Sequence, residues 1–343
     1  MFSTPVSEDV LQDGMDRFRF RTLQSSSVKP RRGALGYIVN SVIGEYIVCM
    51  AHEFILMFLI AIFAGFFGAL VGIGGGVIIV PALSLLFNLP IHLAIAASIV
   101  SVIATSIAGA LSYVDQQITN VRLGMFLEVA TTTGALLGAL LGVLMHGYVL
   151  SLIFGALIFY MAIVSFRTRN KEERMIESGG YEKAKQDSLS RALMLEGTYH
   201  DHALGREVSY RATKPIQGSF VAMLAGVGSG LLGIGGGVIK VAAMNTMMSI
   251  PMKAAVATSK FMIGVTAATS AVVYFIAGGI NVYIVAPVAL GTMLGATGGS
   301  AVMNRLHSKV IKTVFFLLMI YLGYQMIGKG LMMGFAFKLP GLM

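Results

Sequence analysis

Two lysines in the second half of the chain lie inside apolar sequence, where a positive charge is costly. Lys240 stands in Val-Ile-Lys-Val and Lys260 in Ala-Thr-Ser-Lys-Phe-Met. Residues 215–343 include eight Lys and Arg but no Asp or Glu, so this half has no acidic side chain to neutralise them. A buried cation within a membrane is a functional candidate by default, and an anionic substrate is its simplest counter-charge. The alternative is that each ammonium group extends along its stem to the membrane interface.

A glycine-rich heptapeptide, Gly-Ile-Gly-Gly-Gly-Val-Ile, occurs at 72–78 and again at 233–239 within apolar sequence. Each glycine costs a helix interior about 1 kcal/mol relative to Ala, so three in a row predict a break. The two triplets are Gly74, Gly75, Gly76 and Gly235, Gly236, Gly237. The helix N-termini that follow the breaks offer free N–H groups to an anion. Close helix packing is the alternative, but packing does not require a triplet.

A single gapless offset of 161 residues relates the two heptapeptides (233 − 72 = 161) and continues far beyond them. Pairs that match at this offset include Ser98 with Ser259, Thr105 with Thr266, and Tyr113 with Tyr274. We therefore expect residues from about 64 to 166 to be duplicated as about 225 to 327. Lys240 and Lys260 match Ile79 and Ile99, so the charges break the symmetry of the repeats.

Polar side chains near these features are further candidates for the site. Thr258 and Ser259 precede Lys260, and Ser98 holds the matching place in the first half. Hydroxyl groups can donate to oxyanions, although Ser and Thr are equally ordinary helix-packing residues. Glu128 lies about two turns into its apolar segment, where it could take up a coupling proton. Pairing with Arg122 near the membrane interface is the slightly favoured interpretation of Glu128.

Composition places the chain among polytopic membrane proteins. Hydrophobic residues make up 56% and charged residues 12% of the 343 positions, and the mean hydropathy is +0.80. We expect an all-α integral membrane protein with two homologous repeats of about five helical pieces each. One piece in each repeat, 76–89 and 237–249, is too short to span, since a span needs roughly 17–25 residues. Each could be a half-helix or one arm of a re-entrant hairpin.

Charge and hydropathy divide the chain into five parts. A polar N-terminal segment covers 1–33, and the first repeat covers 34–166, with an extra N-terminal helix at 34–50. A polar loop follows at 167–216, with one short amphipathic helix around 182–195. The second repeat covers 217–335, and a tail covers 336–343.

The placement of Lys and Arg predicts the orientation in the membrane. The N-terminal segment and the central loop are rich in these residues, so we expect both on the cytoplasmic side of the cell membrane. The turn before the last apolar segment carries Arg305, Lys309 and Lys312, whereas the equivalent turn of the first repeat has only His146. This asymmetry favours inverted repeats. Parallel repeats are the alternative if each glycine-broken pair crosses once.

Other functions find little support in the sequence. The basic residues form no soluble domain or stripe, which argues against nucleic-acid binding and leaves membrane lipid as a partner. Cys49 is the only cysteine, and His200-Asp201-His202 stands alone in the polar loop, so we expect no metal and no cofactor. With no nucleophile–base pair in view, we expect no enzymatic activity. The sequence leaves a homo-oligomeric assembly open.

The motifs resemble those of the TauE/SafE family, also called the sulfite exporter or 4-toluene sulfonate uptake family. In the first half the resemblance rests on 72–81, 88–90 and 96–98, and in the second on 230–241, 250–255 and 257–259. It covers about 53–330 and implies secondary transport of sulfur-containing anions. The family's proline after the second triplet is Ala242 here, while Pro81 keeps it in the first copy. Lys260 stands where a neutral polar residue is expected.

We therefore expect a permease that binds an oxyanion between the two glycine breaks. Backbone N–H groups, Lys240 and the neighbouring hydroxyls would hold the anion, and one repeat would move against the other. One alternative is an anion channel, which would share the site but need a continuous pore. Another is a membrane anchor or signalling component that acts through the central loop.

Overall fold

The computed structural model describes residues 34–71, 74–167, 187–201, 206–303, 308–335 and 337. The predicted N-terminal segment 1–33, much of the central loop and most of the tail 336–343 lie outside these residues. The chain divides into two units after Leu56, and each is described by itself. Residues 34–56 of the first unit are helical, and every contact discussed below lies in the second unit, which begins at Met57.

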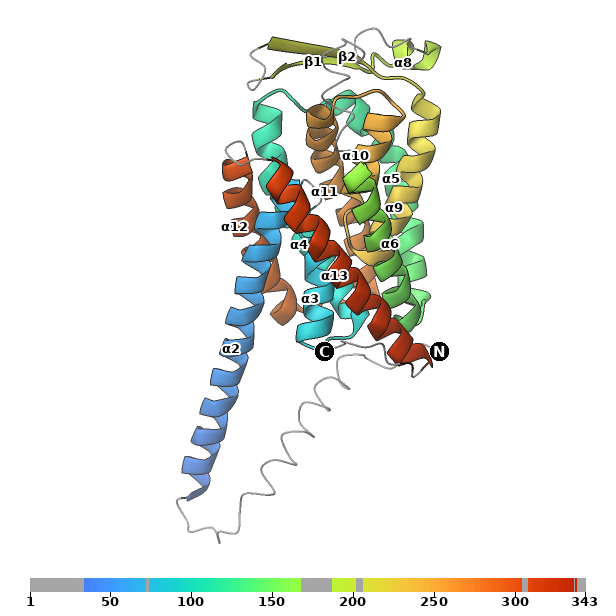
Figure 1. The fold of residues 1–343 in the computed structure, drawn as a ribbon. Helices are drawn as coiled ribbons and strands as arrows, with labels where there is room; N and C mark the ends of the chain where they lie inside the picture. Colours follow the sequence, from blue (N-terminus) through green and yellow to red (C-terminus); the bar gives the residue numbers. More distant parts are fainter. Residues whose placement is uncertain are drawn as a thin grey trace. The chain divides into compact units, whose positions relative to one another are not determined.

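The described chain is mostly helical and suited to a membrane, which confirms the predicted class (Figure 1). The longer helices are α2 (Ala34–Val71), α4 (Ile91–Asp115), α5 (Val121–Leu144), α6 (Gly147–Arg167), α9 (Pro215–Leu232), α11 (Met252–Ile276), α12 (Val282–Met303) and α13 (Ser308–Phe335). Seven of the described helices, all of these except α6, are long and apolar enough to cross a bilayer. The two short pieces predicted after the glycine triplets are helices α3 (Gly76–Leu86) and α10 (Gly237–Thr246).

The predicted extra helix at 34–50 is not a separate element. It continues without interruption through the next apolar segment as α2, a helix of 38 residues. The polar residues His52 and Glu53 interrupt the apolar sequence at this place. Neither residue is a strong helix breaker, and no Gly or Pro stands between the two segments, so the helix does not end there.

The described helices begin at positions that recur with the offset found in the sequence. The starts of α3, α4, α5 and α6 (76, 91, 121 and 147) lie 161 residues before those of α10, α11, α12 and α13 (237, 252, 282 and 308). The duplication itself stays a prediction. The recurrence shows that both halves place their helix breaks and turns at matching residues.

Equivalent helices run in opposite directions where they meet. Gly109 of α4 faces Lys260 of α11, while Ser106, one turn earlier in α4, faces Gly264, one turn later in α11. The helices α4 and α11 are therefore antiparallel, although they occupy matching positions in the two halves. Correspondingly, α3 lies near the lower end of the bundle and α10 near its upper end (Figure 1). This arrangement supports the inverted orientation of the two predicted repeats.

Glycines let the helices of the bundle approach closely. Gly134 and Gly138 of α5 lie against backbone atoms of Met223 and Val227 in α9. A Cβ at either glycine would collide with a carbonyl oxygen, so no larger residue fits without a shift of the backbone. Glycines of α12 pack in the same way on the part of α2 that belongs to the second unit. Close packing of this kind replaces the hydrophobic driving force that helices lack in lipid.

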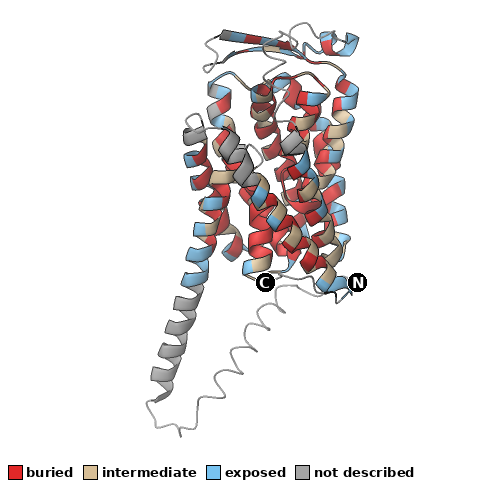
Figure 2. Ribbon diagram, in the orientation of Figure 1, coloured by how far each residue is buried: buried red, intermediate tan, exposed pale blue. Residues whose placement is uncertain are grey.

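The buried residues of the second unit line the inside of the helix bundle, and exposed apolar residues lie outside (Figure 2). Met125, Val129, Phe275 and Ile276 are between 62% and 80% exposed. Large apolar side chains on the outer surface of a helix bundle are expected where the surrounding solvent is lipid.

The central stretch contains a β-hairpin that the sequence did not predict. After the short helix α8 (Ser188–Ala192), strands β1 (Glu196–Asp201) and β2 (Arg206–Arg211) pair antiparallel. Tyr199, Val208 and Tyr210 are buried in a cluster with Leu123 of α5 and Met248 beyond α10. Alternate residues thus face the bundle. The described part of the predicted solvated loop is instead docked on one end of the helices.

Candidate functional site

The two glycine breaks meet inside the bundle. A Cβ on Gly76 would collide with the carbonyl oxygen of Gly233, which shows how closely the two breaks approach. Gly74 and Gly235 both adopt a φ of 79°, a left-handed conformation that side chains rarely accept. The triplets therefore break the helical path, as the sequence predicted: α3 begins at Gly76 and α10 at Gly237, the last glycine of each triplet, at a shared place in the core.

Two of the predicted hydroxyl residues, Ser98 and Ser259, hold these breaks, and the third, Thr258, contacts the start of α5. Ser98 donates a hydrogen bond to the carbonyl oxygen of Gly233 at 2.7 Å, and Ser259 donates to that of Gly237 at 3.4 Å. Thr258 Oγ1 accepts a hydrogen bond from the backbone N–H of Asn120 at 3.1 Å. In this conformation both serine hydroxyl groups donate their protons to backbone carbonyl oxygens. A role for these hydroxyls toward substrate stays a prediction.

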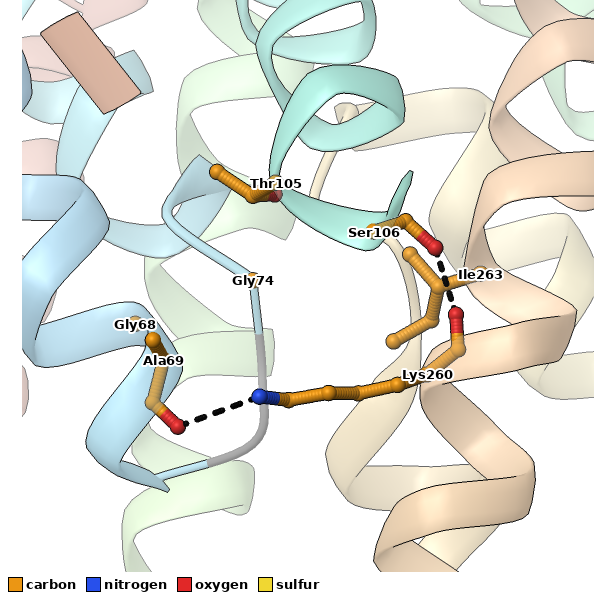
Figure 3. A pocket seen from close by; sticks show the side chains of 7 residues that line it. All are labelled: Gly68, Ala69, Gly74, Thr105, Ser106, Lys260 and Ile263. Carbon is orange, nitrogen blue, oxygen red and sulfur yellow. Dashed lines mark hydrogen bonds between the residues drawn. The ribbon is translucent and has the colours of Figure 1, made fainter. Parts of the chain in front are cut away.

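Lys260 extends into a small pocket between three helices. The pocket is lined by Gly68 and Ala69 of α2, Gly74, Thr105 and Ser106 of α4, and Lys260 and Ile263 of α11. In Figure 3 the Lys260 side chain reaches across the pocket toward the carbonyl oxygen of Ala69, which lies 3.3 Å from Nζ. The same ammonium lies 4.9 Å from the centre of the Tyr113 ring.

The chain makes room for the Lys260 side chain and fixes its backbone. A Cβ at Gly109 would lie 3.0 Å from Lys260 Cδ, closer than side chains normally approach, so glycine leaves space for the lysine stem. Ser106 donates to the backbone carbonyl oxygen of Lys260 at 2.5 Å. Only 4% of the residue is exposed. Among the described residues no carboxylate forms an ion pair with this ammonium, which contacts the Ala69 carbonyl oxygen and the face of the Tyr113 ring.

Lys240 has a different environment. It is 1% exposed, and its ammonium donates to Thr266 Oγ1 at 2.7 Å. Thr266 in turn donates to Glu128 Oε1 at 2.7 Å, and its hydroxyl also lies 2.9 Å from the carbonyl oxygen of Met262. The acid-free second half thus receives a counter-charge for Lys240 from α5 of the first half.

The favoured interpretation of Glu128, an ion pair with Arg122, is wrong. Arg122 directs its guanidinium to Met194 Sδ at 3.3 Å, while Glu128 Oε1 accepts from Thr266. The Glu128 residue is 7% exposed, and its Oε2 has no hydrogen-bond partner. Among the described residues, Glu128 is therefore linked through Thr266 to the Lys240 ammonium and not to Arg122.

Sequence reasoning missed Thr266, which lies between Lys240 and Glu128. It also missed five residues that line the Lys260 pocket: Gly68, Ala69, Thr105, Ser106 and Ile263. The repeat map carried a signal for two of them, since Thr105 and Thr266 match at the 161-residue offset. In the structure each belongs to the surroundings of one lysine: Thr105 lines the pocket that Lys260 enters, and Thr266 contacts Lys240.

No cluster of metal-ligating side chains occurs in the part of the chain that the structure describes. His200 and Asp201 lie in strand β1, and His202 lies outside the described residues. The site chemistry available from the described residues is therefore that of ammonium groups, hydroxyls, one carboxylate and backbone dipoles. Such groups bind and release ions; they supply no nucleophile held by a base.

Comparison with known proteins agrees with this picture. Residues 57–326 match the family described as Sulfite exporter TauE/SafE. The chain is 27% identical over 287 residues to the probable membrane transporter protein YunE of Bacillus subtilis (strain 168), covering 81% of this chain and 99% of that protein. It is 26% identical over 264 residues to the probable membrane transporter protein YdhB of the same organism, covering 77% and 94%. No solved structure gave a significant match.

Proposed function

Because the chain belongs to the sulfite exporter TauE/SafE family of membrane transporters, we propose that it carries small sulfur-containing oxyanions across the cell membrane. Sulfite, sulfonates and sulfoacetate are the substrate class. Transport is secondary, driven by an ion gradient, and the central stretch with its hairpin faces the cytoplasm. The protein performs no chemistry on its substrate.

The observation that carries the proposal is the Lys260 pocket. A buried ammonium without an acidic neighbour among the described residues leaves one positive charge to be balanced. An anion entering the pocket would meet this charge in a medium of low dielectric constant, where the attraction is far stronger than in water. The N-terminus of α3, which follows Gly74 in the pocket lining, adds partial positive charge from its free N–H groups.

This assignment moves the main anion contact from Lys240 to Lys260. The internal Glu128 carboxylate already compensates Lys240 through Thr266. The two glycine breaks remain part of the site because they pack on each other beside the pocket. Ser98 and Ser259 hold the breaks in place, and Thr258 holds the start of α5, so these hydroxyls would act on the anion only when the two halves move relative to each other.

Flux measurements in proteoliposomes test the proposal. The purified full-length chain is reconstituted, and uptake of labelled sulfite, sulfoacetate and 4-toluenesulfonate is compared with uptake of chloride and acetate. We expect saturable uptake and countertransport of at least one sulfur oxyanion, and no comparable uptake of the control anions. Failure to move any sulfur oxyanion would contradict the substrate class. Non-saturating, voltage-driven anion current would indicate a channel instead.

A further inference from the structure

Glu128 is a buried acid with an unused oxygen. Its side chain is 7% exposed, and Oε2 has no hydrogen-bond partner, while Oε1 accepts from Thr266. Thr131, one turn further along α5, donates to the backbone carbonyl oxygen of Glu128 at 3.1 Å. A carboxylate oxygen left unpaired in a membrane helix is expensive, and a bound proton removes that cost.

Lys240 is the charged group that is linked to this carboxylate, through Thr266 Oγ1. The helices that pack on α5 are α9 and α11. Helix α9 carries no ionisable side chain. On α11, Lys253 is exposed, Lys260 reaches Ala69 in the pocket, and Tyr274 donates to Leu231. On α5 itself Arg122 turns to Met194.

We propose that Glu128 Oε2 binds the coupling proton, and that its arrival releases the charge of Lys240 for the transported anion. With Glu128 ionised, the pair that meets at Thr266 has no net charge. With Glu128 protonated, one positive charge remains, and a bound anion balances it. The inference rests on the proposed function, since it concerns the ion that drives the same transport.

The geometry fits a proton better than a metal cation. Lys240 Nζ lies 2.7 Å from Thr266 Oγ1, so a sodium ion at Thr266 and Glu128 would meet an ammonium group directly. A proton on Oε2 breaks no existing hydrogen bond, because Thr266 keeps Oε1 as its acceptor.

The helices that carry the two lysines are joined next to the anion site. Ser259, which precedes Lys260 in α11, donates to the carbonyl oxygen of Gly237, one turn before Lys240 in α10. Each bound ion therefore strengthens the binding of the other, by the same factor in both directions. The proton and the anion bind in one state and cross the membrane together.

The test compares Glu128→Gln with wild type in proteoliposomes. The probes are 4-toluenesulfonate and sulfoacetate, whose charges do not change around neutral pH. Two assays are run: exchange of labelled for unlabelled anion at equal pH, and accumulation driven by a pH gradient. The amide mimics the protonated acid, so we expect Glu128→Gln to keep exchange and to lose accumulation by about tenfold or more. Glu207→Gln, an exposed change in β2, serves as the matched control and should retain both.

The outcomes separate the two proposals. If wild type exchanges neither probe nor sulfite, the proposed function fails and this inference falls with it. If wild type accumulates anion and Glu128→Gln accumulates it equally well, the inference alone is overturned. Accumulation driven by a sodium gradient at constant pH would overturn it too.

A second measurement does not depend on the variant's folding. Anion binding to the purified wild-type protein near neutral pH should take up protons, up to about one for each anion bound. Calorimetry in buffers of different ionisation enthalpy gives this number. Binding without proton uptake at any pH would contradict the role of Glu128.

Discussion

Lys240 and Glu128 meet at one hydroxyl group, Thr266 Oγ1, which lies 2.7 Å from the ammonium nitrogen and 2.7 Å from the carboxylate oxygen. The two charged residues come from opposite halves of the chain. Lys260 has no such partner among the described residues and faces a pocket instead. The two lysines that look alike in the sequence therefore have different tasks: one is part of an internal charge pair, and the other is available to a ligand.

Removing the hydroxyl that joins the pair should uncouple transport. Thr266→Val leaves the Lys240 ammonium and Glu128 Oε1 without their shared partner, at a cost of about 1–3 kcal/mol for the buried groups. We expect accumulation of sulfonate under a pH gradient to fall about tenfold, while Thr266→Ser, which keeps the hydroxyl, stays within about twofold of wild type. Initial uptake rates in proteoliposomes measure both. Equal rates for the two variants would show that the hydroxyl does not link the charges.

The contact between the glycine breaks should resist even a methyl group. Gly76→Ala places a Cβ against the carbonyl oxygen of Gly233, and overpacking of this kind costs about 1–3 kcal/mol. Gly298→Ala is the matched change, because Gly298 lies in α12 with nothing within 4 Å of an added Cβ. It should gain about 0.5–1 kcal/mol from helix propensity. Thermal unfolding in detergent should therefore show a lower midpoint for Gly76→Ala only. A midpoint for Gly76→Ala at or above that of wild type would mean that the two glycine breaks are not packed as described.

Helix breaks and lengths could be predicted from the sequence because they depend on local residues. The glycine triplets and the 161-residue register placed the starts of α3 and α10 at Gly76 and Gly237. Contacts between the two halves could not be predicted in this way, because the register pairs equivalent positions of the repeats and not residues that are neighbours in space. Glu128 matches Ala289 in that register, so nothing in it pointed to Lys240.

The sequence contained a signal for the hairpin, but the polar composition of the stretch obscured it. Tyr199, Val208 and Tyr210 are spaced so that alternate residues face the bundle, which is the period of a strand. Charged residues between them made the stretch resemble a solvated loop. The buried face exists only because the ends of α5, α9 and α11 supply an apolar surface, which is a tertiary effect.

Docking of the hairpin should depend on the Tyr210 hydroxyl, which lies 3.2 Å from Asn120 Nδ2. Tyr210→Phe should cost about 1 kcal/mol and speed amide hydrogen exchange in 196–211, measured by mass spectrometry. Burial raises the pKa of Tyr210 above its ordinary value of 10.0, despite the opposing hydrogen bond from Asn120. The folded state therefore favours the neutral phenol. The resulting contribution to the free energy of unfolding is complete below pH 10.0 and is lost as the pH rises through the raised pKa. Unchanged exchange in Tyr210→Phe would show that the hydroxyl does not hold the hairpin.

Transport by Lys260→Met tests the central claim most directly. The methionine keeps the apolar stem and removes the charge that the pocket presents to an anion. Lys253→Met makes the same change on the exposed face of α11 and serves as the control. In proteoliposomes with labelled sulfite and 4-toluenesulfonate, we expect kcat/KM for uptake to fall by about tenfold or more in Lys260→Met and by less than about twofold in Lys253→Met. Wild-type uptake of these anions by Lys260→Met would contradict the assignment of the pocket as the anion site.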